Sequence, residues 1–148
     1  MDFFSQLFGN RVFLCAVFSW VAAQAIKVLI SLWIDKKFDG RRFIGMGGMP
    51  SSHTAFVFSL MLMVGITEGV GSTLFALAFA LAAVVIYDAM GVRAETGKQG
   101  AVLNEIIREV LIEGEPITEK RLKELVGHTP LEVLGGIVVA IVMVLIMA

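Results

Sequence analysis

Four apolar segments alternate with polar ones along the chain. They run over 12–34, 52–66, 70–87 and 130–148. A helix needs about 20 apolar residues to cross a bilayer core of about 30 Å, and the second segment is at the short end of that range. Only Thr67, Glu68 and Gly69 separate the second and third segments, so we expect these two to form an antiparallel hairpin. The pattern predicts an all-α integral membrane bundle of about four transmembrane helices, in one domain over 1–148.

The polar stretch between the third and fourth segments carries its own periodicity. Apolar residues recur at helical spacing from Leu103 to Leu111, with Glu105, Arg108 and Glu109 on the other side. This spacing predicts an amphipathic helix over about 100–113, lying at the membrane surface or against the bundle. A second short helix is expected over 118–126.

Composition supports a membrane class and adds little about partners. Hydrophobic residues make up 57% of the chain, above the usual value of about 45–50%. The net charge of -1 gives no reason to expect a nucleic-acid partner. The single cysteine, Cys15, excludes an internal disulfide and offers no metal-binding spacing. The first apolar segment is too long for a cleaved signal peptide, so we expect it to be retained as a membrane helix.

Positive charges are distributed unevenly about the predicted spans. One side carries ten of the twelve Lys and Arg residues: Lys36, Lys37, Arg41, Arg42, Arg93, Lys98, Arg108, Lys120, Arg121 and Lys123. The positive-inside rule makes that side cytoplasmic and both termini external, in a multi-pass protein of the cell membrane. The two histidines of the chain, His53 and His128, are on the same side.

His128 precedes the fourth segment in the run Gly127-His128-Thr129-Pro130-Leu131-Glu132. Thr129 and Glu132 have capping-box spacing and Pro130 suits the first helical position, so the run could be simply a well-formed helix start. That interpretation does not explain the histidine. In the other interpretation, Glu132 holds one ring nitrogen of His128 and leaves the second as a nucleophile.

His53 ends a glycine-rich run, Gly47-Gly48-Met49-Pro50-Ser51-Ser52-His53. Gly48 allows a ligand to approach the backbone, and Ser51 or Ser52 can cap the following helix. The amides and the positive end of that helix favour an anion, to which His53 could donate a proton. The alternative is an ordinary loop followed by a helix cap.

Several other polar residues are candidates for contact with an anion. Lys27 is costly to bury in a membrane helix, so it is either functional or extends to the interface. Candidate phosphate-binding and supporting residues on the predicted cytoplasmic side are Arg41, Arg42, Arg93, Asp88, Gln99 and Asn104. The alternative for Gln99 and Asn104 is a solvated helix face.

These motifs resemble a known family. Pro50-Ser51-Ser52-His53 is similar to the Pro-Ser-Gly-His motif of type 2 phosphatidic acid phosphatases (PAP2), which are related to the vanadium haloperoxidases. The divergent branch of that superfamily, small bacterial and plant membrane proteins, is the better match, with corresponding motifs at 47–53, 88–93, 103–104 and 127–133. The resemblance implies that His128 is the nucleophile, Glu132 its orienting carboxylate and His53 the acid and base. It also implies that Ser51 and Ser52 belong to the phosphate-binding loop.

The chain departs from the parent family in three ways. The first motif, Lys-x6-Arg-Pro, is absent because Ile34 stands seven residues after Lys27. Lys27 with Arg41 or Arg42 would replace it. The third-motif arginine is Leu122 here, and Arg93 is the expected replacement. Four predicted spans instead of six allow a homodimer to complete the fold.

The resemblance predicts a metal-independent histidine phosphatase that needs no cofactor. Its substrate would be the phosphomonoester or pyrophosphate of a lipid, such as phosphatidylglycerophosphate, phosphatidate or a polyprenyl phosphate. The alternative is a non-catalytic membrane protein that binds anionic lipid or phosphate. A small transporter is a third hypothesis, based on Lys27 and Asp88 near the membrane.

Overall fold

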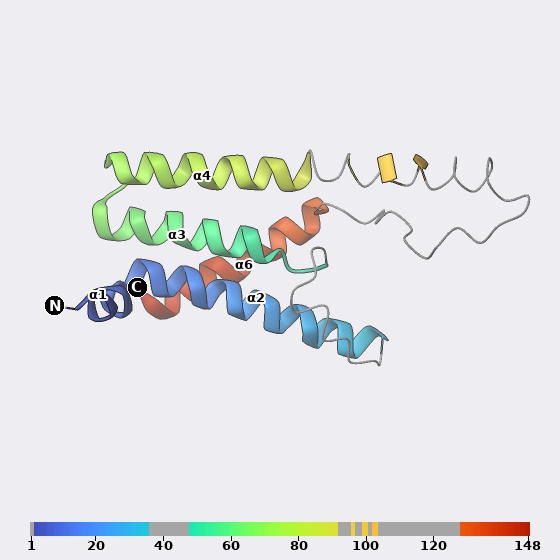
Figure 1. Cartoon of the computed structure of the whole chain (residues 1–148), viewed down its shortest axis with the longest axis horizontal. Coiled ribbons are helices and arrows are strands. Elements are labelled where there is room, and N and C mark those ends of the chain that lie inside the picture. Colours follow the sequence, from blue (N-terminus) through green and yellow to red (C-terminus); the bar gives the residue numbers. More distant parts are fainter. Residues whose placement is uncertain (1, 36–47, 92–95, 97–98, 101, 104–127) are drawn as a thin grey trace, which may run out of the picture.

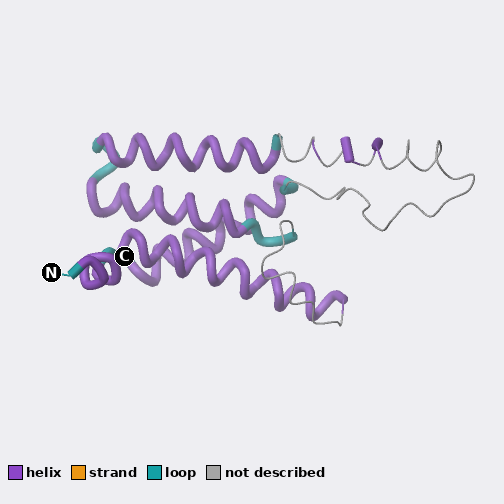
Figure 2. Tube along the Cα trace, viewed as in Figure 1, coloured by secondary structure: helices purple, strands orange, loops and turns teal. Residues whose placement is uncertain are grey.

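Helices pack side by side in the computed structural model, which describes residues 2–35, 48–91, 96, 99–100, 102–103 and 128–148 (Figure 1). The long helices are α2 (Arg11–Asp35), α3 (Ser52–Glu68), α4 (Thr73–Met90) and α6 (Pro130–Met147), and a short α1 (Phe3–Gly9) precedes them. No strand occurs among the described residues (Figure 2). The prediction of an all-α protein is confirmed.

The helix α3 is the centre of the bundle. It packs against α2, α4 and α6, and α2 also packs against α6. By length and apolar composition, Arg11–Trp33, Thr73–Met90 and Pro130–Met147 can each cross a membrane, and Ser52–Glu68 is a shorter apolar helix. At about 1.5 Å per residue, the 17 residues of α3 extend about 25 Å. The protein is therefore a helical membrane protein, and its described residues include three candidate spans beside a shorter central helix.

Side chains are arranged in the manner expected in lipid, with small residues inside and large apolar residues outside. Fully or almost fully buried positions on the helices include Ala16, Ser19, Ala23, Ser59, Ala82 and Ala140. Large apolar side chains on α2, α4 and α6 are exposed, among them Trp33 at 85% and Leu145 at 78%. Small residues let helix backbones approach each other where lipid supplies no hydrophobic force between helices.

Helix caps set where the helices begin, and they move some of the expected boundaries. The side chain of Ser72 accepts a hydrogen bond from the Phe75 amide at 3.1 Å, so α4 begins at Thr73 and not at 70. The hairpin turn consequently runs over 69–72, where Gly69 has a φ of 83°. At its other end α4 continues to Met90. The helix α1 is not expected from the sequence, because seven residues are too few to give a spanning pattern.

The antiparallel order of the helices places distant segments at the same end of the bundle. Both chain termini and the turn between α3 and α4 lie at one end (Figure 1). The end of α4, the loop before α3 and the start of α6 lie at the other. Both histidines are on this second end, although 75 positions separate them in the sequence.

Candidate functional site

The two histidines of the chain face each other at this end of the bundle. Their ring centroids are 6.2 Å apart and the rings are tilted by 48°. His53 is in the first turn of α3 and half-buried, whereas His128 directly precedes the cap of α6 and is 6% exposed. At this separation two imidazoles can both approach one small group, so the geometry is compatible with two-histidine chemistry.

His128 is held by Glu132, one helical turn later. The Nδ1 atom of His128 lies 2.9 Å from Oε2 of Glu132. An ionised carboxylate can only accept hydrogen bonds, so in a neutral imidazole Nδ1 carries the proton. The Nε2 atom then has the lone pair, which is the state required of a nucleophile or base.

Glu132 also completes a capping box at the start of α6. Its amide donates to Oγ1 of Thr129 at 3.3 Å, and its Oε2 accepts from the Thr129 amide at 3.2 Å. The two interpretations that the sequence leaves open are therefore both realised. The same carboxylate caps the helix and orients the histidine.

Backbone contacts tie the segments that carry the two histidines to each other. The Ser51 amide donates to the Glu132 carbonyl at 2.9 Å, and the His128 amide donates to the Ala89 carbonyl at 2.9 Å. A Cβ atom on Gly136 would stand 2.5 Å from the Ser51 carbonyl oxygen. The start of α6 is thus fastened to the loop before α3 and to the end of α4.

Ser51 acts as the N-cap of α3. Its Oγ accepts from the Thr54 amide at 3.3 Å and from the Thr54 hydroxyl at 2.9 Å. Ser51 and Thr54 are fully buried, and Ser52 is 3% exposed. His53 is therefore in the first turn of α3, at the positive end of the helix. Direct contact of Ser51 or Ser52 with a phosphate stays a prediction, and the part played by Thr54 is not apparent from the sequence.

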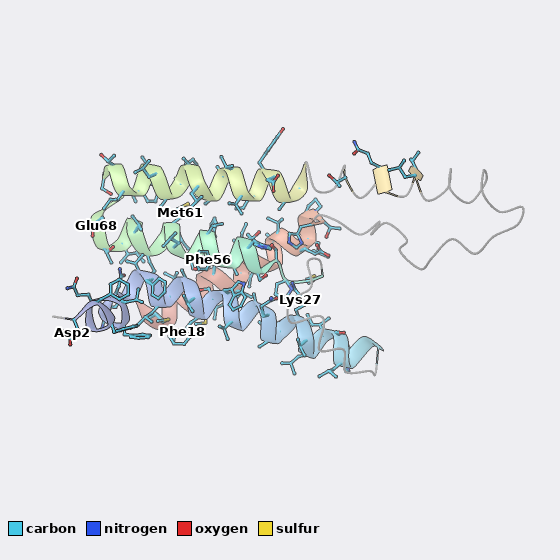
Figure 3. The ribbon with its side chains drawn as sticks, in the orientation of Figure 1. Asp2, Phe18, Lys27, Phe56, Met61 and Glu68 are labelled. Atoms are coloured by element: carbon cyan, nitrogen blue, oxygen red, sulfur yellow. The ribbon has the colours of Figure 1, made fainter. Side chains whose placement is uncertain are left out.

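Lys27 is placed near this site by α2. It is buried, with 6% exposure, and Figure 3 shows it beside the starts of α3 and α6, while Asp2 and Glu68 lie at the opposite end. A Cβ on Gly48 would lie 3.7 Å from the Cγ and Cδ atoms of Lys27, and Gly48 has a φ of +86° that favours glycine. Lys27 and Glu132 interact electrostatically. The structure therefore brings Lys27, Gly48 and the histidine pair to one end of the bundle.

The remaining candidates are only partly described. Asp88 lies in the last turn of α4 and is half-buried. Gln99 is helical and exposed. Arg41, Arg42, Arg93 and Asn104 lie outside the described residues, as do the expected helix over 118–126 and most of the one over 100–113. Within the described part of the chain, no group of three or more His, Cys, Asp or Glu residues could hold a metal ion.

Comparisons with known proteins identify a family and a membrane-protein relative. The model of a family described as "Divergent PAP2 family" matches residues 8–143. A protein of Bacillus subtilis (strain 168), named "Uncharacterized membrane protein YuiD", is 34% identical over 153 residues, and the match covers 97% of each chain. No solved structure matches.

Proposed function

Because the chain belongs to the divergent PAP2 family, we propose that it is a phosphatase that hydrolyses a phosphorylated membrane lipid through a phosphohistidine intermediate. The single observation that supports this most is the paired arrangement of His128 with Glu132, opposite His53. A helix start capped by Thr129 needs neither a histidine bonded to Glu132 nor a second imidazole nearby.

In the first step, Nε2 of His128 attacks the phosphorus atom of the lipid phosphomonoester. A nitrogen–phosphorus bond forms and the bond between phosphorus and the ester oxygen breaks. His53 donates a proton to that oxygen, so the lipid alcohol leaves in neutral form. Glu132 stabilises the positive charge that develops on His128, because its carboxylate already accepts the Nδ1 proton.

In the second step, water attacks the phosphohistidine. His53, now neutral, takes a proton from the water as the new phosphorus–oxygen bond forms. The nitrogen–phosphorus bond breaks, inorganic phosphate leaves and His128 returns to its starting state. The cycle consumes one water molecule and is balanced without a metal ion or a cofactor.

Charge stabilisation of the phosphoryl oxygens supplies most of the catalysis in reactions of this class. The N-terminus of α3, capped by Ser51, and the buried Lys27 are the described groups suited to that role. Gly48, in the loop before α3, and Ser52, the first residue of α3, are proposed to contact the same phosphate. We propose that further contacts to the phosphate come from the arginines Arg41, Arg42 and Arg93. The supporting polar residues would be Asp88, Gln99 and Asn104.

The proposed substrate follows from the position of the site in the bundle. The histidines lie at the end of helices whose outer faces are apolar, so a phosphate bound there would be at the level of lipid headgroups. The excess of Lys and Arg on this side supports our proposal that this end faces the cytoplasm across the cell membrane and that both termini are outside. Phosphatidylglycerophosphate, phosphatidate and polyprenyl phosphates all present such a group.

Phosphate release from a panel of these lipids by the purified protein in detergent tests the proposal. We expect release from at least one lipid, inhibition by vanadate, which mimics pentacoordinate phosphorus, and loss of release in folded His128→Ala. Binding of the lipids without any release would support the non-catalytic alternative. Full activity in His128→Ala would exclude the mechanism.

A further inference from the structure

One oxygen atom of Glu132 serves two partners. Oε2 accepts from Nδ1 of His128 at 2.9 Å and from the Thr129 amide at 3.2 Å. The hydroxyl of Thr129 in return accepts from the Glu132 amide at 3.3 Å. The carboxylate that holds the histidine is therefore itself held by the backbone amide of Thr129, the residue next to that histidine, while the Thr129 hydroxyl holds the backbone amide of Glu132.

A carboxylate that orients a histidine must be ordered to be effective. A free glutamate side chain samples many rotamers, and its ordering costs conformational entropy. The side chain of Glu132 is 18% exposed, so it is not fully shielded from water. The capping box restricts Glu132 to the rotamer that points back along the helix toward residue 128. The cap at Thr129 can thus determine whether the Glu132 carboxylate accepts a hydrogen bond from His128 or is solvated by water.

We propose that Thr129 is a positioning residue: its hydroxyl fixes the cap geometry in which its backbone amide holds Oε2 of Glu132, and Oε2 there keeps the proton of His128 on Nδ1. The proposal rests on the proposed function as far as catalysis is concerned, because only a nucleophilic His128 needs a free Nε2. The position of the proton, in contrast, is a property of the resting protein. It can be measured whether or not the protein is a phosphatase.

A purely structural role for Thr129 is the competing explanation, and the chain contains a matched control for it. Ser72 caps α4 through the same kind of bond, from the Phe75 amide to its Oγ at 3.1 Å. This cap lies at the opposite end of the bundle from the histidines (Figure 1). Ser72→Ala therefore removes a helix cap without touching the site.

The direct test is ¹⁵N NMR of the histidine rings in protein labelled at histidine and purified in detergent. The chain has two histidines, and His53→Gln assigns their signals. We expect His128 to be the Nδ1-protonated tautomer in the unaltered protein, in Thr129→Ser and in Ser72→Ala. In Thr129→Val we expect a mixture of both tautomers. Thr129→Gly is the second variant, because glycine is tolerated at a helix cap but lacks the hydroxyl.

Kinetics provide the second readout. Thr129→Val should lower kcat by about 10–100-fold, the usual effect of removing a group that orients a catalytic ligand. KM should stay unchanged, and Thr129→Ser should restore the rate. A single Nδ1-protonated tautomer in both Thr129→Val and Thr129→Gly would overturn the proposal. Failure of the unaltered protein to release phosphate would instead overturn the proposed function. The NMR tautomers of the Thr129 variants would then decide the proposal about Thr129 without the kinetics.

Discussion

The amide of Ser51 donates a hydrogen bond of 2.9 Å to the carbonyl oxygen of Glu132. Ser51 caps the helix that carries His53, and Glu132 holds His128. This one backbone bond therefore joins the two halves of the candidate site. The separation of the imidazoles depends on how closely α6 approaches the start of α3.

Gly136 sets that approach. A methyl group there would lie 2.5 Å from the Ser51 carbonyl oxygen and 2.9 Å from Cβ of Thr54, so Gly136→Ala must push α6 away from α3. We expect a loss of about 1–3 kcal/mol in stability, as for other overpacked interiors, and a larger relative loss of phosphatase activity. Thermal unfolding in detergent and phosphate release measure the two effects. Gly71→Ala is the control, since nothing lies within 4 Å of its Cβ, and equal behaviour of the two variants would contradict the account.

Glu132→Gln tests the orienting carboxylate. The amide preserves the shape of the side chain but cannot balance the charge that develops on His128. We expect kcat to fall on the order of 100-fold or more, as when a histidine of a catalytic triad loses its carboxylate. KM should change little because Glu132 does not contact the phosphate in the proposed mechanism. A variant with unaltered kcat would show that the bond at 2.9 Å is only structural.

His53→Ala tests the proton donor through the leaving group. A natural lipid alcohol needs a proton to leave, whereas a nitrophenol leaves readily as an anion. The variant should therefore lose about 10²–10⁴-fold of its activity on a lipid phosphate and much less of its first-step rate on a nitrophenyl phosphate. Rapid-quench measurement of nitrophenol release gives that rate. Equal losses on both substrates would argue against His53 as the acid.

Lys27→Met tests the buried cation. Removal of a positive charge that faces the phosphoryl group should weaken vanadate inhibition and lower kcat/KM by about 10²–10³-fold, the usual effect of one lost electrostatic stabiliser. Lys27→Arg should retain part of the vanadate inhibition and part of kcat/KM. Arg11→Met is the control, because Arg11 is an exposed cation at the beginning of α2. Unchanged vanadate inhibition in Lys27→Met would leave Lys27 as a structural partner of Glu132.

The fold class and the family could be predicted from the sequence because their signals are local. Apolar segments of spanning length predict an all-α membrane protein, and the motifs around His53 and His128 predict the family that residues 8–143 match. The sequence also predicts the caps of α3 and α6, and the structure confirms them, whereas the cap of α4 was missed. Ser72 resembles any other turn residue until its bond to Phe75 is seen, so the start of α4 was expected three residues too early.

The assembly of the site could not be predicted, for a physical reason. The contacts from Ser51 to Glu132 and from His128 to Ala89 join backbone atoms, and backbone atoms are the same in every residue type. Gly136 matters because it has no side chain, which lets α6 approach Ser51 closely. The sequence also presents the capping box and the His128 partner as competing roles of Glu132, whereas a carboxylate oxygen can accept two hydrogen bonds at once. The catalytic roles of all these residues stay predictions.

Covalent labelling of the enzyme tests the central claim most directly. The protein is mixed with the ³²P-labelled lipid phosphate that it hydrolyses fastest, quenched in alkali to preserve phosphohistidine and digested for mass spectrometry. We predict a phosphoryl group on His128 in the unaltered protein and none in His128→Ala. Phosphate release without any label on His128, at a rate that His128→Ala retains, would contradict the account.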